Sequence, residues 1–148
     1  MTERINYASG SPWEPLRGFS RAVQIGNTLA ISGTTAQVAS GDVVGGSSSY
    51  AQTRFALEQV KKILAGSGFA LTDVVRTRLR VTNLADFGEY ARAHHEVFEA
   101  VRPASSIVQV VRLVDPRLLV EIEVDAMRGV SEWSSQRLSL HEGPLDKR

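Results

Sequence analysis

Two stretches of the chain alternate between apolar and charged residues with a period of two. In the range Val74–Val81, an apolar series alternates with a basic one: Val75, Thr77, Leu79 and Val81 against Arg76, Arg78 and Arg80. In the range Leu118–Met127, Glu121 and Glu123 interrupt an aliphatic run. Successive side chains of a β-strand point to opposite faces of the sheet, so each stretch predicts a strand with one apolar and one charged face. Because unpaired charges in a core are costly, the charged faces must be paired, hydrated or used for function.

Two helices are predicted from apolar residues at helical spacing. The first runs from about 50 to 65 and follows a run of N-cap candidates at 47–49. Its buried stripe is Ala56, Leu57, Val60, Ile63 and Leu64. The second runs from about 86 to 100, and its packed side is Phe87, Tyr90, His94, Val97 and Phe98. Pro103 closes this segment, because the residue before a proline avoids helical geometry.

The remaining patterns predict further strands. Two strands, 19–25 and 28–32, form a hairpin whose turn is Gly26-Asn27, since both residues tolerate a positive φ. Other strands are expected at 2–7, 106–111 and 118–127. The order strand–strand–strand–helix–strand–helix–strand–strand predicts an α+β domain whose mostly antiparallel sheet carries both helices on one face. We expect a single domain over residues 1–130 and a polar tail over 131–148.

Composition narrows the classes of function. The formal net charge of +1 gives no general support to nucleic-acid binding. The 148 residues contain no cysteine, which excludes disulfides, thiol nucleophiles and Cys-ligated metals. In His94-His95-Glu96 the histidines are adjacent, whereas zinc-binding pairs on a helix are spaced i, i+4, so we predict one packed histidine, one solvated histidine and no metal site. No window approaches the roughly 18 apolar residues of a membrane helix, and the N-terminal stretch lacks the apolar core of a signal peptide. We expect a cytoplasmic protein that needs no cofactor.

Four segments resemble the RidA/YjgF family, the reactive-intermediate deaminases. They run in continuous order from about Phe19 to Met127 and read GFSRAVQIGNTLAISG, GDVVGG followed by AQTRFALEQVKKILAGSG, LTDVVRTRLRVTNLADF, and RPASSIVQVVRLVDPRLLVEIEVDA. The resemblance implies a chorismate-mutase-like fold and a homotrimer, in which the sheets form a central barrel and small-molecule clefts lie between neighbouring subunits. The family members whose activity is best understood hydrolyse 2-imino or enamine acids to 2-keto acids and ammonia.

The chain departs from the family's pattern at three positions of the expected cleft. The family motif after the second helix usually reads Pro-Ala-Arg-Ser, and its arginine holds the substrate carboxylate. Ser105 stands at that position here, and a hydroxyl cannot supply a charged bidentate contact. Phe19 replaces the usual tyrosine, and Ala91 replaces a frequent asparagine. The positions that match the family's cleft are Ser32, Gly33 and Glu121. The resemblance therefore implies an imine-deaminase fold with an altered pocket.

The candidate site residues have two readings each. Glu121 either orients a water for hydrolysis or forms an ion pair with an arginine of the basic strand. Arg78 and Arg80 either replace the missing carboxylate anchor or pair with acidic residues inside the barrel. Ser105 and Ser106 either form hydrogen bonds with a ligand, through hydroxyl or backbone N–H groups, or form a small-residue loop after the proline.

Three functions follow from these alternatives. The first is a homotrimer that binds a small molecule in its intersubunit clefts and hydrolyses an imine or enamine. Glu121 orients water, and backbone N–H groups near 32–33 or 105–106 polarise the substrate. The second is a metabolite-binding or regulatory trimer without turnover, which the absent arginine motivates. The third, a ribonuclease, gains little from a net charge of +1 and from a sequence with no evident histidine pair for phosphodiester cleavage.

Overall fold

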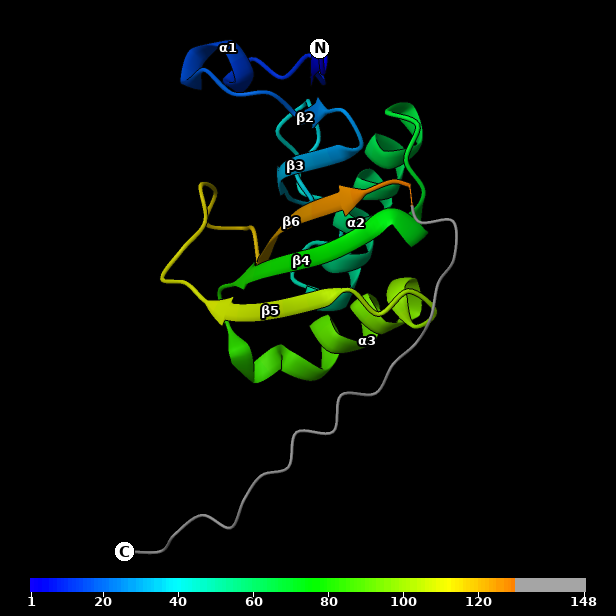
Figure 1. The fold of residues 1–148 in the computed structure, drawn as a ribbon. Helices are drawn as coiled ribbons and strands as arrows, with labels where there is room; N and C mark the ends of the chain where they lie inside the picture. Colours follow the sequence, from blue (N-terminus) through cyan, green and yellow to red (C-terminus); the bar gives the residue numbers. More distant parts are fainter. Residues whose placement is uncertain (130–148) are drawn as a thin grey trace, which may run out of the picture.

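The computed structural model describes residues 1–129, which form one six-stranded sheet and its helices (Figure 1). The predicted polar tail at 131–148 lies outside the described residues. The elements in chain order are β1 (Arg4–Tyr7), α1 (Trp13–Arg17), β2 (Ala22–Ile25), β3 (Thr28–Thr34), α2 (Ser49–Gly66), β4 (Val74–Val81), α3 (Phe87–Phe98), β5 (Ala104–Gln109) and β6 (Val120–Met127). Short 3₁₀ turns, Leu71–Asp73 and Leu84–Asp86, precede β4 and α3.

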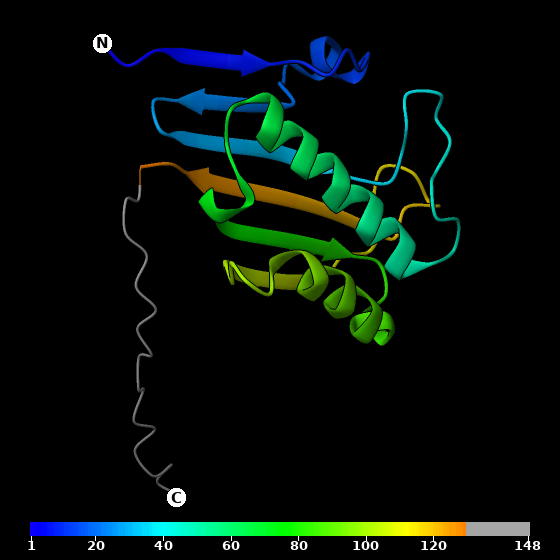
Figure 2. The ribbon, with the colours of Figure 1, turned by 90° about the vertical axis from the view of Figure 1, so that its right-hand side faces the viewer.

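The strands lie in the order β1-β2-β3-β6-β4-β5, and every neighbouring pair is antiparallel except β4 and β5. The parallel pair follows from α3, which crosses from the end of β4 back to the start of β5. Both long helices lie on the same face of the sheet, α2 across β3 and β6 and α3 beside β4 and β5 (Figure 2). The predicted α+β fold, with a mostly antiparallel sheet and two helices on one face, is confirmed.

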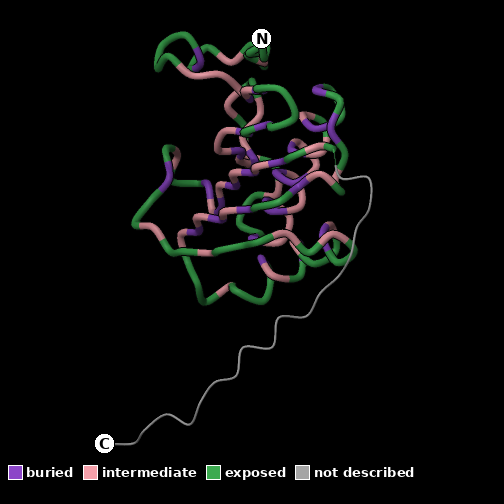
Figure 3. Tube along the Cα trace, in the orientation of Figure 1, coloured by how far each residue is buried: buried purple, intermediate pink, exposed green. Residues whose placement is uncertain are grey.

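The core lies between this sheet face and the helices, where the buried segments concentrate in Figure 3. On β6 the side chains of Val120, Ile122 and Val124 are each 0% exposed. Each such burial stabilises the fold by about 1.5–3 kcal/mol relative to an exposed side chain. The predicted stripe of α2 packs here, and its N-cap is Ser48, whose side chain accepts a hydrogen bond from the Ala51 N–H at 3.1 Å.

The hairpin turn is confirmed, because Ile25 and Thr28 are paired across Gly26-Asn27 and Gly26 has a positive φ of 57°. The element order is also confirmed, apart from one helix that the sequence did not indicate. The stretch expected to be a loop contains the five-residue α1, which Gly18 ends in the left-handed conformation with φ 68°.

Two apolar residues expected in the core lie elsewhere. Val75 is 47% exposed, because a bulge between Val74 and Arg76 in the pairing with β6 lets Val74 take the buried place instead. Phe87 is 53% exposed, because it is the first residue of α3 and borders a cavity rather than the core. Strand β5 also begins two residues earlier than predicted, at Ala104, so Ser105 belongs to the strand.

None of the helices among residues 1–129 is long and apolar enough to cross a membrane.

Candidate active site

A ladder of ion pairs covers the sheet face that carries no helix. In the register of β4 and β6, Arg78 lies opposite Glu123 and Arg80 lies opposite Glu121. Each arginine nevertheless approaches the next carboxylate along β6 more closely. Arg78 Nη1 lies 3.0 Å from Asp125 Oδ2 and 4.0 Å from Glu123 Oε2. Arg80 Nη1 lies 2.7 Å from Glu123 Oε1 and 4.0 Å from Glu121 Oε1. The ladder is shifted by one carboxylate, and Glu121 is left at its end.

Glu121 is therefore different from the other two carboxylates. Asp125 and Glu123 each accept a hydrogen bond from an arginine, whereas the Glu121 carboxylate accepts none from any other residue within 1–129. Its side chain is still only 26% exposed. A half-buried carboxylate with free acceptor positions can hold a water or a ligand donor.

The end of β3 approaches the Glu121 carboxyl group closely. A Cβ atom built on Gly33 would lie 2.5 Å from Glu121 Cδ and 2.8 Å from Oε2. Real Cβ atoms do not approach other atoms so closely, so only glycine at this position leaves the carboxylate where it is. The two family positions predicted from separate strands are thus in direct contact.

Arg21 supports the backbone around Gly33. Its Nη2 donates to the Gly33 carbonyl at 2.7 Å, while its buried Nε has no hydrogen-bond partner among the described residues. Burial lowers the pKa of the Arg21 guanidinium, and the carboxylates of Glu14 and Glu121 partly offset that effect. A half-buried guanidinium beside the site adds positive potential near Glu121. Sequence reasoning missed Arg21, because nothing in the predicted strand 19–25 indicated that its side chain would reach Gly33.

Phe19 and Ser32 lie at the same end of the sheet. The Ser32 hydroxyl donates to the Ser20 carbonyl at 2.7 Å, and its backbone N–H donates to the Arg21 carbonyl at 3.1 Å. Both Ser32 donors are therefore used within the chain, and only its hydroxyl lone pairs remain for a ligand. Of the backbone N–H groups predicted to polarise a substrate, that of Ser32 is therefore already used, and the role of the other N–H groups stays a prediction. The Phe19 ring stacks against the Arg17 guanidinium, whose carbon lies 4.7 Å from the ring centroid.

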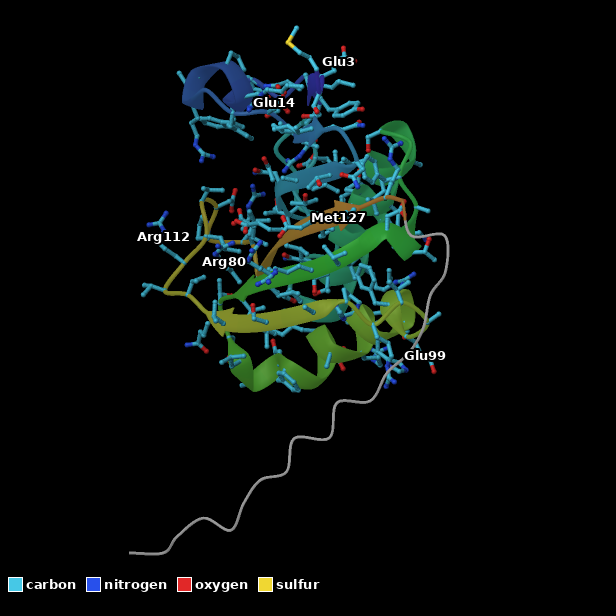
Figure 4. The ribbon with its side chains drawn as sticks, in the orientation of Figure 1. Glu3, Glu14, Arg80, Glu99, Arg112 and Met127 are labelled. Atoms are coloured by element: carbon cyan, nitrogen blue, oxygen red, sulfur yellow. The ribbon has the colours of Figure 1, made fainter. Side chains whose placement is uncertain are left out.

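A cavity of about 410 Å³ opens beside Glu121. Its lining combines two guanidinium groups, one carboxylate and apolar side chains: Arg80, Arg112, Glu121, Val110, Leu113 and Val114. Arg80 comes from β4 and Arg112 from the loop after β5, and both lie on the same side of the molecule in Figure 4. Sequence reasoning missed Arg112, because nothing in its loop indicated which strand end it would approach.

Ser105 and Ser106 point to opposite faces of the sheet, as successive strand residues do. Ser106 is in register with Arg78 on the open face. Ser105 is in register with Thr77 on the helix-covered face, and their hydroxyl oxygens are 2.8 Å apart. Thr77 Oγ1 also lies 2.9 Å from His94 Nε2 on α3. Within one chain, Ser105 and Glu121 are therefore separated by the sheet.

A second cavity, of about 210 Å³, lies beside Ser105. No charged residue lines it, and its walls come from β4, α3 and β5: Leu79, Phe87, Tyr90, Ala91, His94, Ser105 and Ile107. Burial lowers the pKa of the His94 imidazole below its ordinary value of 6.5. The prediction of one packed and one solvated histidine is confirmed, since His94 is half-buried and His95 is exposed. Among residues 1–129 no group of three or more potential ligands is arranged to hold a metal ion.

Comparison with known proteins identifies the fold and its family. A family model described as endoribonuclease L-PSP matches residues 10–128. The chain is 34% identical over 122 residues to the 3-aminoacrylate deaminase RutC of Acinetobacter baylyi, a match that covers 82% of this chain and 95% of the relative. An uncharacterized Streptomyces coelicolor protein is 39% identical over 122 residues, which cover 82% of this chain and 90% of that protein.

A crystal structure supports the same assignment. A Mycobacterium tuberculosis protein described as a member of the YjgF/YER057c/UK114 family superimposes with a TM-score of 0.77 and 40% identity, covering 85% of this chain and 100% of that one. The sheet topology, the matched residues and these relatives agree, and the chain belongs to the RidA/YjgF family, the family of the L-PSP model.

Proposed function

We propose that this protein binds a small organic molecule and hydrolyses an imine or enamine, with Glu121 orienting the attacking water. One observation carries the proposal: Glu121 is the carboxylate of the β6 ladder that accepts no hydrogen bond from another residue within 1–129, and it borders a cavity of about 410 Å³. A RutC relative named as a 3-aminoacrylate deaminase supports the reaction class.

The reaction needs one water and a carboxylate that can take and return a proton. As the water oxygen attacks the carbon of the C=N bond, Glu121 accepts one water proton, and the substrate nitrogen takes a second proton from solvent. The resulting carbinolamine then loses its C–N bond. Glu121 takes part by returning its proton to the departing nitrogen, while the hydroxyl group forms the C=O bond and releases its proton to solvent, so that ammonia leaves and a carbonyl compound remains. An enamine enters the same path after protonation on carbon.

The positive groups around Glu121 suit this chemistry. Arg80 Nη1 lies 4.0 Å from the carboxylate, and Arg112 lines the same cavity. Both guanidinium groups favour an anionic or electron-rich substrate in the cavity. Arg78, by contrast, is held by Asp125 at 3.0 Å and lines neither cavity, so its role as a ligand residue stays a prediction.

We also propose that the active form is a homotrimer in which neighbouring chains complete each cleft. Two features support this assembly. The sheet face that carries the ion-pair ladder has no helix over it (Figure 2). The strand register and alternation place exposed apolar side chains on the same face, namely Ile25, Val108 and Met127. Ser105 and Glu121 lie on opposite faces of one sheet, so a single cleft that uses both needs residues from two chains.

Sedimentation velocity tests the assembly directly. We expect one species of about three times the chain mass at micromolar concentration. A stable monomer would contradict both the trimer and the shared cleft.

Glu121→Gln tests the catalytic role. Imines generated in place by an amino-acid oxidase or a dehydratase serve as substrates, and formation of the carbonyl product is measured against the rate in free solution. We expect the substitution to reduce the enzymatic rate by roughly 10²- to 10⁴-fold, because an amide cannot take the water proton. Glu123→Gln, two residues away on the same face, is the matched control and should retain most of the activity. No acceleration by the unmodified protein across several imines and enamines would remove the deaminase proposal.

A metabolite-binding protein without turnover is the second candidate, favoured by the uncharged cavity at the position of the family's arginine. It predicts a ligand-dependent rise in melting temperature with no product formation. The family model is described as an endoribonuclease, but ribonuclease activity has little support here. The formal net charge is only +1, and the adjacent residues His94 and His95 point in different directions on α3. Purified protein that leaves RNA intact would exclude it.

A further inference from the structure

A chain of three polar side chains ends in the cavity beside β5. Thr77 Oγ1 donates to Ser105 Oγ at 2.8 Å and lies 2.9 Å from His94 Nε2. Thr77 is fully buried, and the His94 ring packs against Phe98 with ring centroids 4.7 Å apart. The packing on both sides fixes the positions of Thr77 and the imidazole. Ser105 is the exposed end of the chain.

The single hydroxyl hydrogen of Thr77 sets the direction of the whole chain. When Thr77 donates it to Ser105, Thr77 can only accept from His94, and the imidazole carries its hydrogen on Nε2; with its hydrogen on Nδ1 the chain runs from Ser105 to His94 instead. Ser105 in turn accepts from Thr77, and its own hydrogen is left free. In the direction from His94 to Ser105, the Ser105 hydroxyl is a donor toward the cavity.

The rest of the cavity offers little else to a polar ligand. Among its lining residues, Leu79, Phe87, Ala91 and Ile107 are apolar. The Tyr90 hydroxyl donates to the Leu119 carbonyl at 3.3 Å, so its hydrogen is already used. Burial lowers the pKa of His94, which keeps the imidazole uncharged near neutral pH. An anion in this cavity would thus lose its hydration without meeting a positive charge.

We propose that the hydrogen-bond chain runs from His94 through Thr77 to Ser105, and that the cavity beside β5 binds a small, uncharged carbonyl or imine compound with an apolar substituent, whose oxygen or nitrogen accepts a hydrogen bond from Ser105. The apolar part of the molecule lies against Leu79, Ile107 and the Phe87 ring. Ser105 touches the ligand, while Thr77 and His94 are positioning residues that hold its hydroxyl in the donor orientation. The choice of an imine among such ligands rests on the proposed function; the cavity and the hydrogen-bond chain are complete within one chain.

Three aromatic probes of similar size separate this site from its alternatives. Acetophenone carries an uncharged acceptor, ethylbenzene lacks any polar atom, and benzoate carries a charge. Titration of the full-length protein, followed by NMR shifts of residues around the cavity, should give acetophenone an affinity roughly two- to tenfold above that of ethylbenzene, which is the net effect of one hydrogen bond. Benzoate should bind more weakly than acetophenone. Equal or tighter binding of benzoate, or no binding of acetophenone, overturns the proposal.

Variants assign the contact to its residues. Ser105→Ala should lower the affinity for acetophenone to that for ethylbenzene and leave ethylbenzene unchanged, which excludes collapse of the cavity. Ser105→Thr retains the hydroxyl and should restore the preference. Thr77→Val keeps the shape but breaks the chain, so it should reduce the preference by less than Ser105→Ala does. An acetophenone preference that survives Ser105→Ala would show that Ser105 is not the donor.

The NMR chemical shifts of the His94 ring nitrogens report which nitrogen carries the hydrogen. They would not change if Thr77 and His94 had only a structural role. At neutral pH the ring should be uncharged with its hydrogen on Nε2, and Thr77→Val should weaken that preference. A hydrogen on Nδ1 would contradict the direction of the chain. The outcome is independent of turnover: selective acetophenone binding without imine hydrolysis would remove the proposed reaction and leave this site standing. Imine hydrolysis without acetophenone binding would overturn the proposed binding site and leave the proposed reaction in place.

Discussion

Alternate residues of β6 lie in opposite environments, one face in the core and the other on the open side of the sheet. On the helix-covered face, Ile122 and Val124 are 0% exposed and belong to the apolar core. On the open face, Glu121 and Glu123 keep about a quarter to a third of their side chains exposed and meet arginines of β4. One strand thus contributes to the core and to the candidate site with residues that are adjacent in sequence. A substitution on one face is expected to change stability, and one on the other to change chemistry.

The three carboxylates on the open face of β6 also differ from one another. Glu123 and Asp125 are tied to arginines at 2.7 Å and 3.0 Å, which leaves their oxygens partly occupied. Glu121 has its nearest cation at 4.0 Å and lies against the bare backbone of Gly33. The difference between neighbouring carboxylates arises from the shifted ladder. Arg76 lies opposite Asp125 but forms no ion pair among residues 1–129, so Arg78 pairs with Asp125, Arg80 pairs with Glu123, and Glu121 is left without a close partner.

Ile122→Ala should give the largest effect and test the contrast between the faces. It removes buried methyl groups and leaves a cavity under α2, so the free energy of unfolding should fall by about 2–5 kcal/mol. Glu123→Gln is the matched control on the next residue. It weakens a pair that is about one-third exposed and should cost only about 0–1 kcal/mol in the folded chain. Denaturant titration at low protein concentration measures the free energy of unfolding of both variants. An equal decrease in the two variants would contradict the difference between the two faces of β6.

Gly33→Ala should give a smaller effect, on chemistry more than on stability. The backbone of Gly33 has no positive φ, so alanine fits its conformation, but the new methyl group displaces the Glu121 carboxylate. Misplacing a catalytic group by about 1 Å costs roughly 10- to 100-fold in rate. Gly66→Ala, in α2 with open space around the added carbon, is the control. Imine turnover that remains unchanged in Gly33→Ala would show that the position of Glu121 does not matter.

The helix-covered face was largely readable from the sequence. Helical spacing in α2 predicted its buried stripe, and alternation in β4 and β6 predicted which residues face the core, because both patterns follow directly from backbone geometry. The failures are local. Val75 was assigned to the wrong face because a bulge between Val74 and Arg76 adds one residue and so reverses the alternation of side chains at that point. The alternation of residue types in the sequence does not reveal a bulge.

The open face was readable only in part. The sequence indicated that arginines and carboxylates would share a face, but not that the pairs would shift by one position, which depends on side-chain length across the twisted strands. The contact of Gly33 with Glu121 depends on β3 lying next to β6, and the cavity position of Arg112 depends on the loop after β5. Asp125 was overlooked as a partner of Arg78 for the same reason. Contacts between distant segments follow from tertiary structure, which local patterns do not specify.

A pH titration of stability should show the smallest effect and test whether a titratable group on the helix-covered face behaves as buried. Burial lowers the pKa of His94 below 6.5 in the folded chain, so as the pH falls the unfolded chain takes up its proton first. The free energy of unfolding contributed by His94 is then fully present above about pH 6.5 and declines as the pH falls below it. In His94→Phe this part of the decline should disappear. The measurement is the slope of unfolding free energy between pH 7 and pH 5 in the two proteins, and identical slopes would mean that the imidazole is as well hydrated in the folded chain as in the unfolded one.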